Sequence, residues 1–176
     1  MGARRNPKKL NQEQLWNYAL RTLGQRAHSA AELKKKLAIR ASSAGDLAHT
    51  LSRLREYGFT NDTKFSETFA MSRLQNQGFG KFRVMRDLRA KRVSERVASE
   101  AIEKAYAGID ESELIRNFLE RKYRGKNLAQ FLADEKNLLA AYRRLRTAGF
   151  STGASLSVLK RYNQRADDDW NEAEAE

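Results

Sequence analysis

The sequence predicts an all-α protein built as an elongated array of three tandem three-helix repeats. Apolar residues recur along the chain at the three- and four-residue spacing of amphipathic helices. A second pattern occurs three times: in each copy, two apolar residues, which we call anchors, stand fourteen residues apart. The pairs are Leu37 and Leu51, Leu88 and Ile102, and Leu145 and Leu159. Short helices cannot bury an apolar face alone, so we expect the copies to stack around a shared core.

We divide the chain into five segments. The repeats are placed at residues 11–60, 61–108 and 109–163, between a flexible basic arm at 1–10 and an acidic, disordered tail at 164–176. Each repeat has a basic segment that ends at an apolar anchor, then a short polar break with a serine, then another amphipathic helix. This order predicts one basic helix in each repeat.

In the first repeat, an amphipathic helix over about 11–24 is followed by a capping box. Here the Ser29 hydroxyl and the Glu32 carboxylate each satisfy a backbone amide and open the second helix. The third helix ends at Gly58, which we expect in a left-handed conformation, with Phe59 folding back on the helix.

In the second repeat, an acidic N-cap at Asp62 opens a helix that stops at Gly78. The stretch from Gly78 to Lys81 resembles a phosphate-binding loop, but no strand precedes it. We therefore interpret it as a helix stop and restart. Helices over about 81–92 and 94–106 complete the repeat.

In the third repeat, Asp110 is the predicted N-cap of the first helix, and Gly149 ends a later one. The polar stretch 124–135 between them shows no clear pattern. Residues 53–59 and 144–150 resemble each other by letter although they fall at different places in their repeats. We interpret this likeness as shared cap chemistry, because both helices end in Gly-Phe.

The charge of the chain indicates an acidic partner. Lysine and arginine total 34 against 22 acidic residues, a net charge of +12. Six carboxylates lie in the last ten residues, which leaves 34 basic and 16 acidic residues, or +18, on the rest. Such a surface favours nucleic acid or an acidic protein. The acidic tail is either a solubilising terminus or a phosphate mimic that competes for the basic body.

Several functions are excluded or disfavoured. The chain has no cysteine, so it forms no disulfide and no thiolate site. His28 and His49 match no metal-ligand spacing, and His28 fits a local packing or capping role. Motifs of nucleotide-binding proteins and serine hydrolases are absent. We expect no catalytic, cofactor-binding or metal-binding residue and no cofactor, and hence no enzyme. No apolar run approaches the roughly 20 residues that cross a bilayer, and no secretory signal is visible, so we expect a cytoplasmic protein without membrane contact.

Recurring basic clusters are the remaining candidates for function. Any one of them could be a solvated helix face, but their recurrence in stretches poor in carboxylates favours a binding strip. The candidate contact residues for a protein partner or DNA are Lys34, Lys35, Lys36, Arg73, Arg83, Arg86, Arg89, Arg143, Arg144 and Arg146. Neighbouring aromatic residues such as Phe79 and Tyr123 could stack on bases or belong to the core.

The chain resembles the RecX regulatory proteins over about residues 11–162. The resemblance rests first on Tyr18-Ala19-Leu20-Arg21, on His28-Ser29 with Glu32-Leu33, and on Lys36-Leu37. It continues through Tyr57-Gly58-Phe59, the series from Gly80 to Val93, and Arg144-Leu145 with Gly149-Phe150. Two departures are visible: Asn61 stands where the family usually has an acidic residue, and Arg92-Val93 replaces its usual Gly-Ile turn.

The resemblance implies a modulator of the RecA recombinase, a monomer that lies in the groove of the RecA filament on single-stranded DNA. There it limits filament growth, ATP hydrolysis, strand exchange and coprotease activity, and duplex DNA is a further candidate ligand. Two alternatives stay open. One is a sequence-independent DNA-binding protein that acts without RecA, since three-helix units with a basic second helix suit helix-turn-helix docking. The other is an adaptor for an acidic protein.

Overall fold

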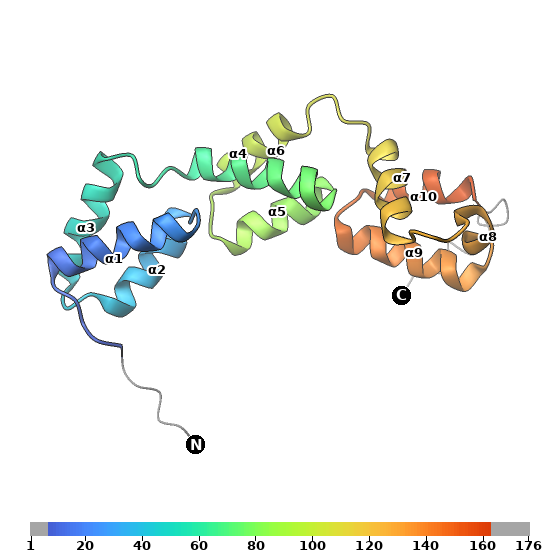
Figure 1. Cartoon of the computed structure of the whole chain (residues 1–176). Coiled ribbons are helices and arrows are strands. Elements are labelled where there is room, and N and C mark those ends of the chain that lie inside the picture. Colours follow the sequence, from blue (N-terminus) through green and yellow to red (C-terminus); the bar gives the residue numbers. More distant parts are fainter. Residues whose placement is uncertain (1–6, 163–176) are drawn as a thin grey trace, which may run out of the picture. The chain divides into compact units, whose positions relative to one another are not determined.

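A computed structural model describes residues 7–162, so residues 1–6 of the predicted arm and the predicted tail at 164–176 lie outside the described residues. Every regular element in the described range is a helix, which confirms the all-α class. The elements are α1 (Gln12–Gln25), α2 (Ala30–Arg40), α3 (Ala44–Glu56), α4 (Asp62–Ser72), the π-helical turn η1 (Arg73–Gln77), α5 (Lys81–Ala90), α6 (Glu95–Ala105), α7 (Glu111–Lys122), α8 (Leu128–Leu132), α9 (Glu135–Ala148) and α10 (Thr152–Lys160) (Figure 1).

The described residues form two compact units. Unit 1 contains the residues up to Phe69 together with Leu88–Ala101, and unit 2 contains Ala70–Asp87 together with the residues from Ile102 on. Helices α4, α5 and α6 each contribute residues to both units. The finer division into repeats at 11–60, 61–108 and 109–163 stays a prediction.

Helices α1, α2 and α3 pack on one another in unit 1. Their core consists of Leu15, Ala19, Leu33, Leu37, Ala41 and Leu54. Leu10, at the end of the predicted arm, is held in place here. Its amide donates to the Arg40 carbonyl at 2.7 Å, and its carbonyl accepts from the Ser42 amide at 3.0 Å. The chain is therefore tied to the end of α2 before α1 begins.

In unit 2, α10 packs against both α7 and α9, and α8 packs against α9. The fully buried residues of their core include Ile115, Leu119, Leu132, Leu145, Phe150 and Leu159. Helix α8 falls in the stretch 124–135, where the sequence shows no clear pattern. Its five residues bury Leu132, and Asn127 caps it by accepting from the Gln130 amide. One buried leucine is too little to produce a visible period in a polar stretch.

The predicted anchors are largely buried. Leu37, Leu88, Ile102, Leu145 and Leu159 are at most 3% exposed. Leu51 is only half-buried, since Thr50 takes the interior position on α3. The fourteen-residue spacing thus marks core positions, with one exception.

Most predicted caps are confirmed, and one is wrong. Ser29 and Glu32 form the capping box of α2. At the start of α4, Asn61 rather than Asp62 accepts from the backbone, at 2.9 Å from the Lys64 amide. The Asp62 carboxylate instead accepts from the Ala30 amide at 2.8 Å and so serves the N-terminus of α2. The acidic residue is a cap, but for a helix 32 residues away.

The two Gly-Phe helix ends have the same local geometry. Gly58 and Gly149 are left-handed, with φ of 69° and 88°. The Phe59 amide donates to the Leu54 carbonyl at 2.9 Å, and the Phe150 amide to the Leu145 carbonyl at 3.2 Å. These matching bonds agree with our interpretation of the letter similarity as shared cap chemistry.

In unit 2, the N-terminus of α5 meets the C-terminus of α9. The Gly80 amide donates to the Ala148 carbonyl at 2.9 Å, and the Phe82 amide to the Gly149 carbonyl at 3.1 Å. Each helix end thus satisfies backbone groups that the other leaves unpaired, with opposite ends of the helix dipoles facing each other. The approach demands glycine, because a Cβ at Gly80 would lie 2.1 Å from the Gly149 oxygen.

Unit 1 contains a comparable contact between α2 and the end of α5. The Ser29 hydroxyl caps α2 and also donates to the Lys91 carbonyl at 2.6 Å. Lys91 directly follows α5, and Arg92 then turns the chain with a left-handed φ of 58°. In both units, therefore, a helix N-terminus meets the C-terminal end of another helix.

The α5–α9 contact predicts a large difference between two glycine substitutions. Gly125 has a φ of 83° and open space around it, so Gly125→Ala should cost only the left-handed strain, about 1 to 2 kcal/mol. Gly149→Ala places a Cβ 2.1 Å from the Arg83 nitrogen and should cost about 1 to 3 kcal/mol more through overpacking. Urea unfolding of both variants measures the two free energies. Equal losses would contradict a close contact at Gly149.

Candidate nucleic-acid interface

Several predicted contact residues in unit 2 take part in the α5–α9 contact. The Arg83 and Arg86 guanidinium groups donate to the Thr147 carbonyl at 3.4 and 3.2 Å. Arg83 also pairs with Asp87 at 3.1 Å, and Arg73 reaches the same carboxylate at 3.5 Å. These three arginines are thus held by structural contacts, which also fix where their charge lies.

The other predicted residues of unit 2 lie on α9, and all three are exposed. Arg146 donates to the Phe150 carbonyl at 2.6 Å, and the Arg144 guanidinium lies 5.6 Å from the centre of the Tyr123 ring. The Arg143 guanidinium has no ion pair or hydrogen bond within the described residues. Arg143 is therefore the residue of this group whose charge is most available to a partner.

In unit 1, the predicted lysines lie on α2. Lys34 and Lys35 are exposed and Lys36 is half-buried, whereas Arg89 pairs with Glu95 at 2.5 Å. Lys35 and Lys36 line a shallow depression that continues across the end of α5. Its full lining is Ala31, Glu32, Lys35, Lys36, Ile39, Ala90, Lys91 and Arg92.

Lys91 and Arg92 belong to one of the basic clusters of the sequence but not to the predicted contact residues, and the fold brings them beside the α2 lysines. They stand more than fifty residues away along the chain, so no local pattern connects the two groups. The depression thus combines cations from α2 and from the turn after α5.

Glu32 connects the two halves of this depression. Its carboxylate lies 3.0 Å from the Lys91 ammonium and 3.5 Å from the Arg26 guanidinium. Burial by itself would raise the pKa of Glu32, but the hydrogen bonds and charges of Lys91 and Arg26, with the Ser29 amide, outweigh it and lower this pKa. Burial and the Arg26 charge also lower the pKa of neighbouring His28. This agrees with the local packing role predicted for His28.

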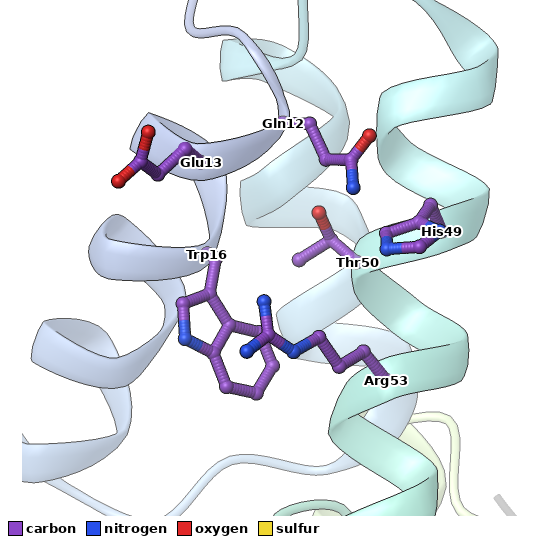
Figure 2. A pocket seen from close by; sticks show the side chains of 6 residues that line it. All are labelled: Gln12, Glu13, Trp16, His49, Thr50 and Arg53. Carbon is purple, nitrogen blue, oxygen red and sulfur yellow. The ribbon is translucent and has the colours of Figure 1, made fainter.

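A second feature of unit 1 is an aromatic cluster that the sequence analysis did not identify as a site. The rings of Trp16, Tyr57 and Phe59 lie with centroids 5.8 to 6.3 Å apart, and the Arg53 guanidinium lies 4.1 Å from the centre of the Trp16 ring. Tyr57 and Phe59 are 63% and 47% exposed. Beside Trp16 and Arg53 is a small pocket between α1 and α3 (Figure 2).

This cluster was missed because the sequence suggested a different role for each member. Trp16 fits the apolar stripe of α1, and Phe59 fits a helix-end contact. The only available signal was the spacing of Arg53 and Tyr57, which stand four residues apart and therefore on one helix face.

The described residues provide no metal centre and no membrane span. Within residues 7–162, no three histidine or acidic side chains are placed to hold a metal ion. None of the helices in the same range has the length and apolar character that a bilayer span requires. What the two units offer chemically is cationic groups for phosphates or carboxylates and aromatic rings for stacking.

The comparisons with known sequences agree with one another. Residues 61–102 match the family model described as RecX, second three-helix domain. The regulatory protein RecX of Mycobacterium sp. (strain JLS) is 33% identical over 153 residues, which cover 84% of this chain and 81% of that protein. The regulatory protein RecX of Trichlorobacter lovleyi is 30% identical over 132 residues, 75% of this chain and 80% of the relative.

Solved structures show the same fold. The crystal structure of RecX from Lactobacillus salivarius has a TM-score of 0.64 at 15% identity, over 86% of this chain and 96% of that one. A further crystal structure of a regulatory protein RecX has a TM-score of 0.68 at 18% identity, over 85% of this chain and 73% of that one. At such identities the likeness concerns the fold alone.

The lowered pKa of Glu32 predicts a pH-dependent contribution to stability. In acid the unfolded chain takes up this proton before the folded one, so the stabilisation is present at neutral pH and disappears as the pH falls through the folded pKa. Glu32→Gln should therefore lose about 1.5 to 3 kcal/mol at pH 7, and this loss should shrink as the pH falls below the ordinary pKa of a glutamate. Urea unfolding across this pH range measures the difference.

His28 is present in both proteins, and its lowered pKa destabilises both from about pH 6.5 downward. The Glu32 charge opposes this lowering, so its loss in the variant adds to the difference as His28 is protonated. The decline of the difference at lower pH, in the range where a glutamate takes up its proton, reports Glu32 itself. A difference that stays constant from pH 7 to pH 3 would contradict the Glu32–Lys91 interaction.

Proposed function

Because the chain belongs to the RecX family of regulatory proteins, we propose that it binds the RecA filament on single-stranded DNA and inhibits the filament's growth, ATP hydrolysis, strand exchange and coprotease activity. The relatives are named regulatory protein RecX, and we therefore propose RecA as the protein that is regulated. The protein acts by binding, without catalysis and without a cofactor. We further propose that it acts as a monomer in the cytoplasm.

The observation that carries the proposal is the presence of available cations in both units. Lys34 and Lys35 are exposed on α2, Arg143 is exposed on α9, and no ion pair within the described residues neutralises them. Phosphates of a DNA strand or carboxylates of a protein filament are the groups that such side chains bind. The net charge of +12 attracts the protein to a filament of this kind over longer distances.

The proposal predicts inhibition of RecA at low ratios of inhibitor to recombinase. ATP hydrolysis by RecA on single-stranded DNA should fall when substoichiometric protein is added, because one bound molecule that limits filament growth affects many RecA subunits. The measurement is the hydrolysis rate across a concentration series. An unchanged rate at every ratio would overturn the proposal.

A variant series tests the cations. Lys34→Ala with Lys35→Ala should weaken co-sedimentation with preformed filaments, and so should Arg143→Ala. If they contact phosphates of single-stranded DNA, each lost contact reduces the salt dependence of binding by about 0.7 in the log–log slope. The control is Arg96→Ala, which also removes an exposed arginine but one already paired with Glu100 at 2.7 Å. A loss of binding as large in the control would show that only total charge matters.

A further inference from the structure

We infer that the pocket between α1 and α3 of unit 1 binds a single unstacked pyrimidine base of single-stranded DNA. This rests on the proposed function in taking single-stranded DNA as the ligand, and it assigns the base contact to a site separate from the cations on α2 and α9. The pocket is lined by Gln12, Glu13, Trp16, His49, Thr50 and Arg53 (Figure 2).

The first argument is size. The pocket measures about 160 Å³. A protein cavity of about 150 Å³ accommodates benzene, so this space suits one six-membered ring. A sugar and a phosphate attached to the ring would remain outside, where the pocket opens to solvent. Dimensions of this kind select the base rather than the whole nucleotide.

The second argument is a polar group without a partner. Thr50 is 1% exposed, and its hydroxyl has no hydrogen-bond partner within the described residues. A buried hydroxyl without a partner costs free energy, which a ligand that supplies one recovers. The hydroxyl oxygen lies on the side of the Gln12 amide (Figure 2). Together these two groups present a donor and an acceptor, which matches the edge of a pyrimidine.

The third argument is the stacking surface. The Arg53 guanidinium lies 4.1 Å from the centre of the Trp16 ring and 5.7 Å from that of Tyr57. Because the guanidinium lies over the indole, a base that enters the pocket can stack on the planar guanidinium and contact the Trp16 ring beside it. Tyr57 and Phe59 extend this surface into solvent, where the next base along the strand can stack.

The charge of the pocket agrees with a neutral ring. Glu13 and Arg53 carry opposite charges, and the Glu13 carboxylate points away from the other five labelled side chains (Figure 2). Arg53 is the one lysine or arginine among the described residues that line the pocket, and its guanidinium lies over the Trp16 ring, so the pocket is not a strongly cationic site of the kind that holds a phosphate. The available cations on α2 and α9 serve that purpose, so phosphate and base contacts are made by different residues.

Trp16 fluorescence provides the test. The chain has two tryptophans, so Trp170→Phe leaves Trp16 as the single emitter. This protein is titrated with a short oligo(dT) and with an oligomer of abasic sites of equal length and charge. We expect saturable quenching by oligo(dT) and none by the abasic oligomer, because only a base reaches the indole. Equal quenching by both, or by neither, overturns the inference.

Three variants in the same background locate the contact. Tyr57→Ala with Phe59→Ala should weaken oligo(dT) binding roughly 5- to 100-fold, as expected for lost base stacking. Thr50→Val retains the shape but removes the hydroxyl and should weaken it about 2- to 10-fold. Phe82→Ala removes a ring that is 64% exposed outside the cluster and should change nothing. Circular dichroism confirms that each variant is folded.

The result is distinguishable from failure of the proposed function. Inhibition of RecA ATP hydrolysis without any quenching by oligo(dT) overturns the base pocket and leaves the regulator intact. Base-dependent quenching without inhibition supports the pocket and overturns the regulator. If the Tyr57 and Phe59 variant loses binding to DNA-free RecA but keeps oligo(dT) binding, the pocket accepts a protein side chain and the inference fails.

Discussion

Satisfaction of the backbone groups at helix ends is the constraint on which this structure most depends. The helices have between five and fourteen residues, so unpaired terminal amides and carbonyls are a large share of their backbone. In unit 2, amides at the start of α5 meet carbonyls at the end of α9. In unit 1, Ser29 and Asp62 perform the same task for α2. Side chains and glycines at these ends therefore make contacts between helices as well as capping their own helix.

This constraint gives several basic residues a structural role. Arg83 and Arg86 extend the cap of α9 through the Thr147 carbonyl, and Arg73 shares Asp87 with Arg83. Their charge contributes to the field of the protein, but their side chains are already in use. Cations without such structural contacts are therefore the ones that can bind a partner directly. Net charge alone could not distinguish these cations from the arginines that are already paired.

The candidate surfaces divide into two chemical kinds. Exposed lysines and Arg143 suit phosphate or carboxylate groups, while Trp16, Arg53 and their aromatic neighbours suit a planar ring. Recognition of single-stranded nucleic acid commonly uses both, with cations along the backbone and rings against the bases.

The helical class, most apolar anchors, and local caps such as Ser29 with Glu32 follow from the sequence, since they depend on residues within one or two turns. The contacts that the cap residues make with distant residues depend on the tertiary fold. Gly58-Phe59 and Gly149-Phe150 make the same backbone bonds, yet Phe150 is fully buried against Phe118, and Phe59 is 47% exposed beside Trp16. The partner of Asp62 and the position of Lys91 beside α2 also depend on the tertiary fold. Contacts between residues distant in sequence leave no periodic signal along the chain.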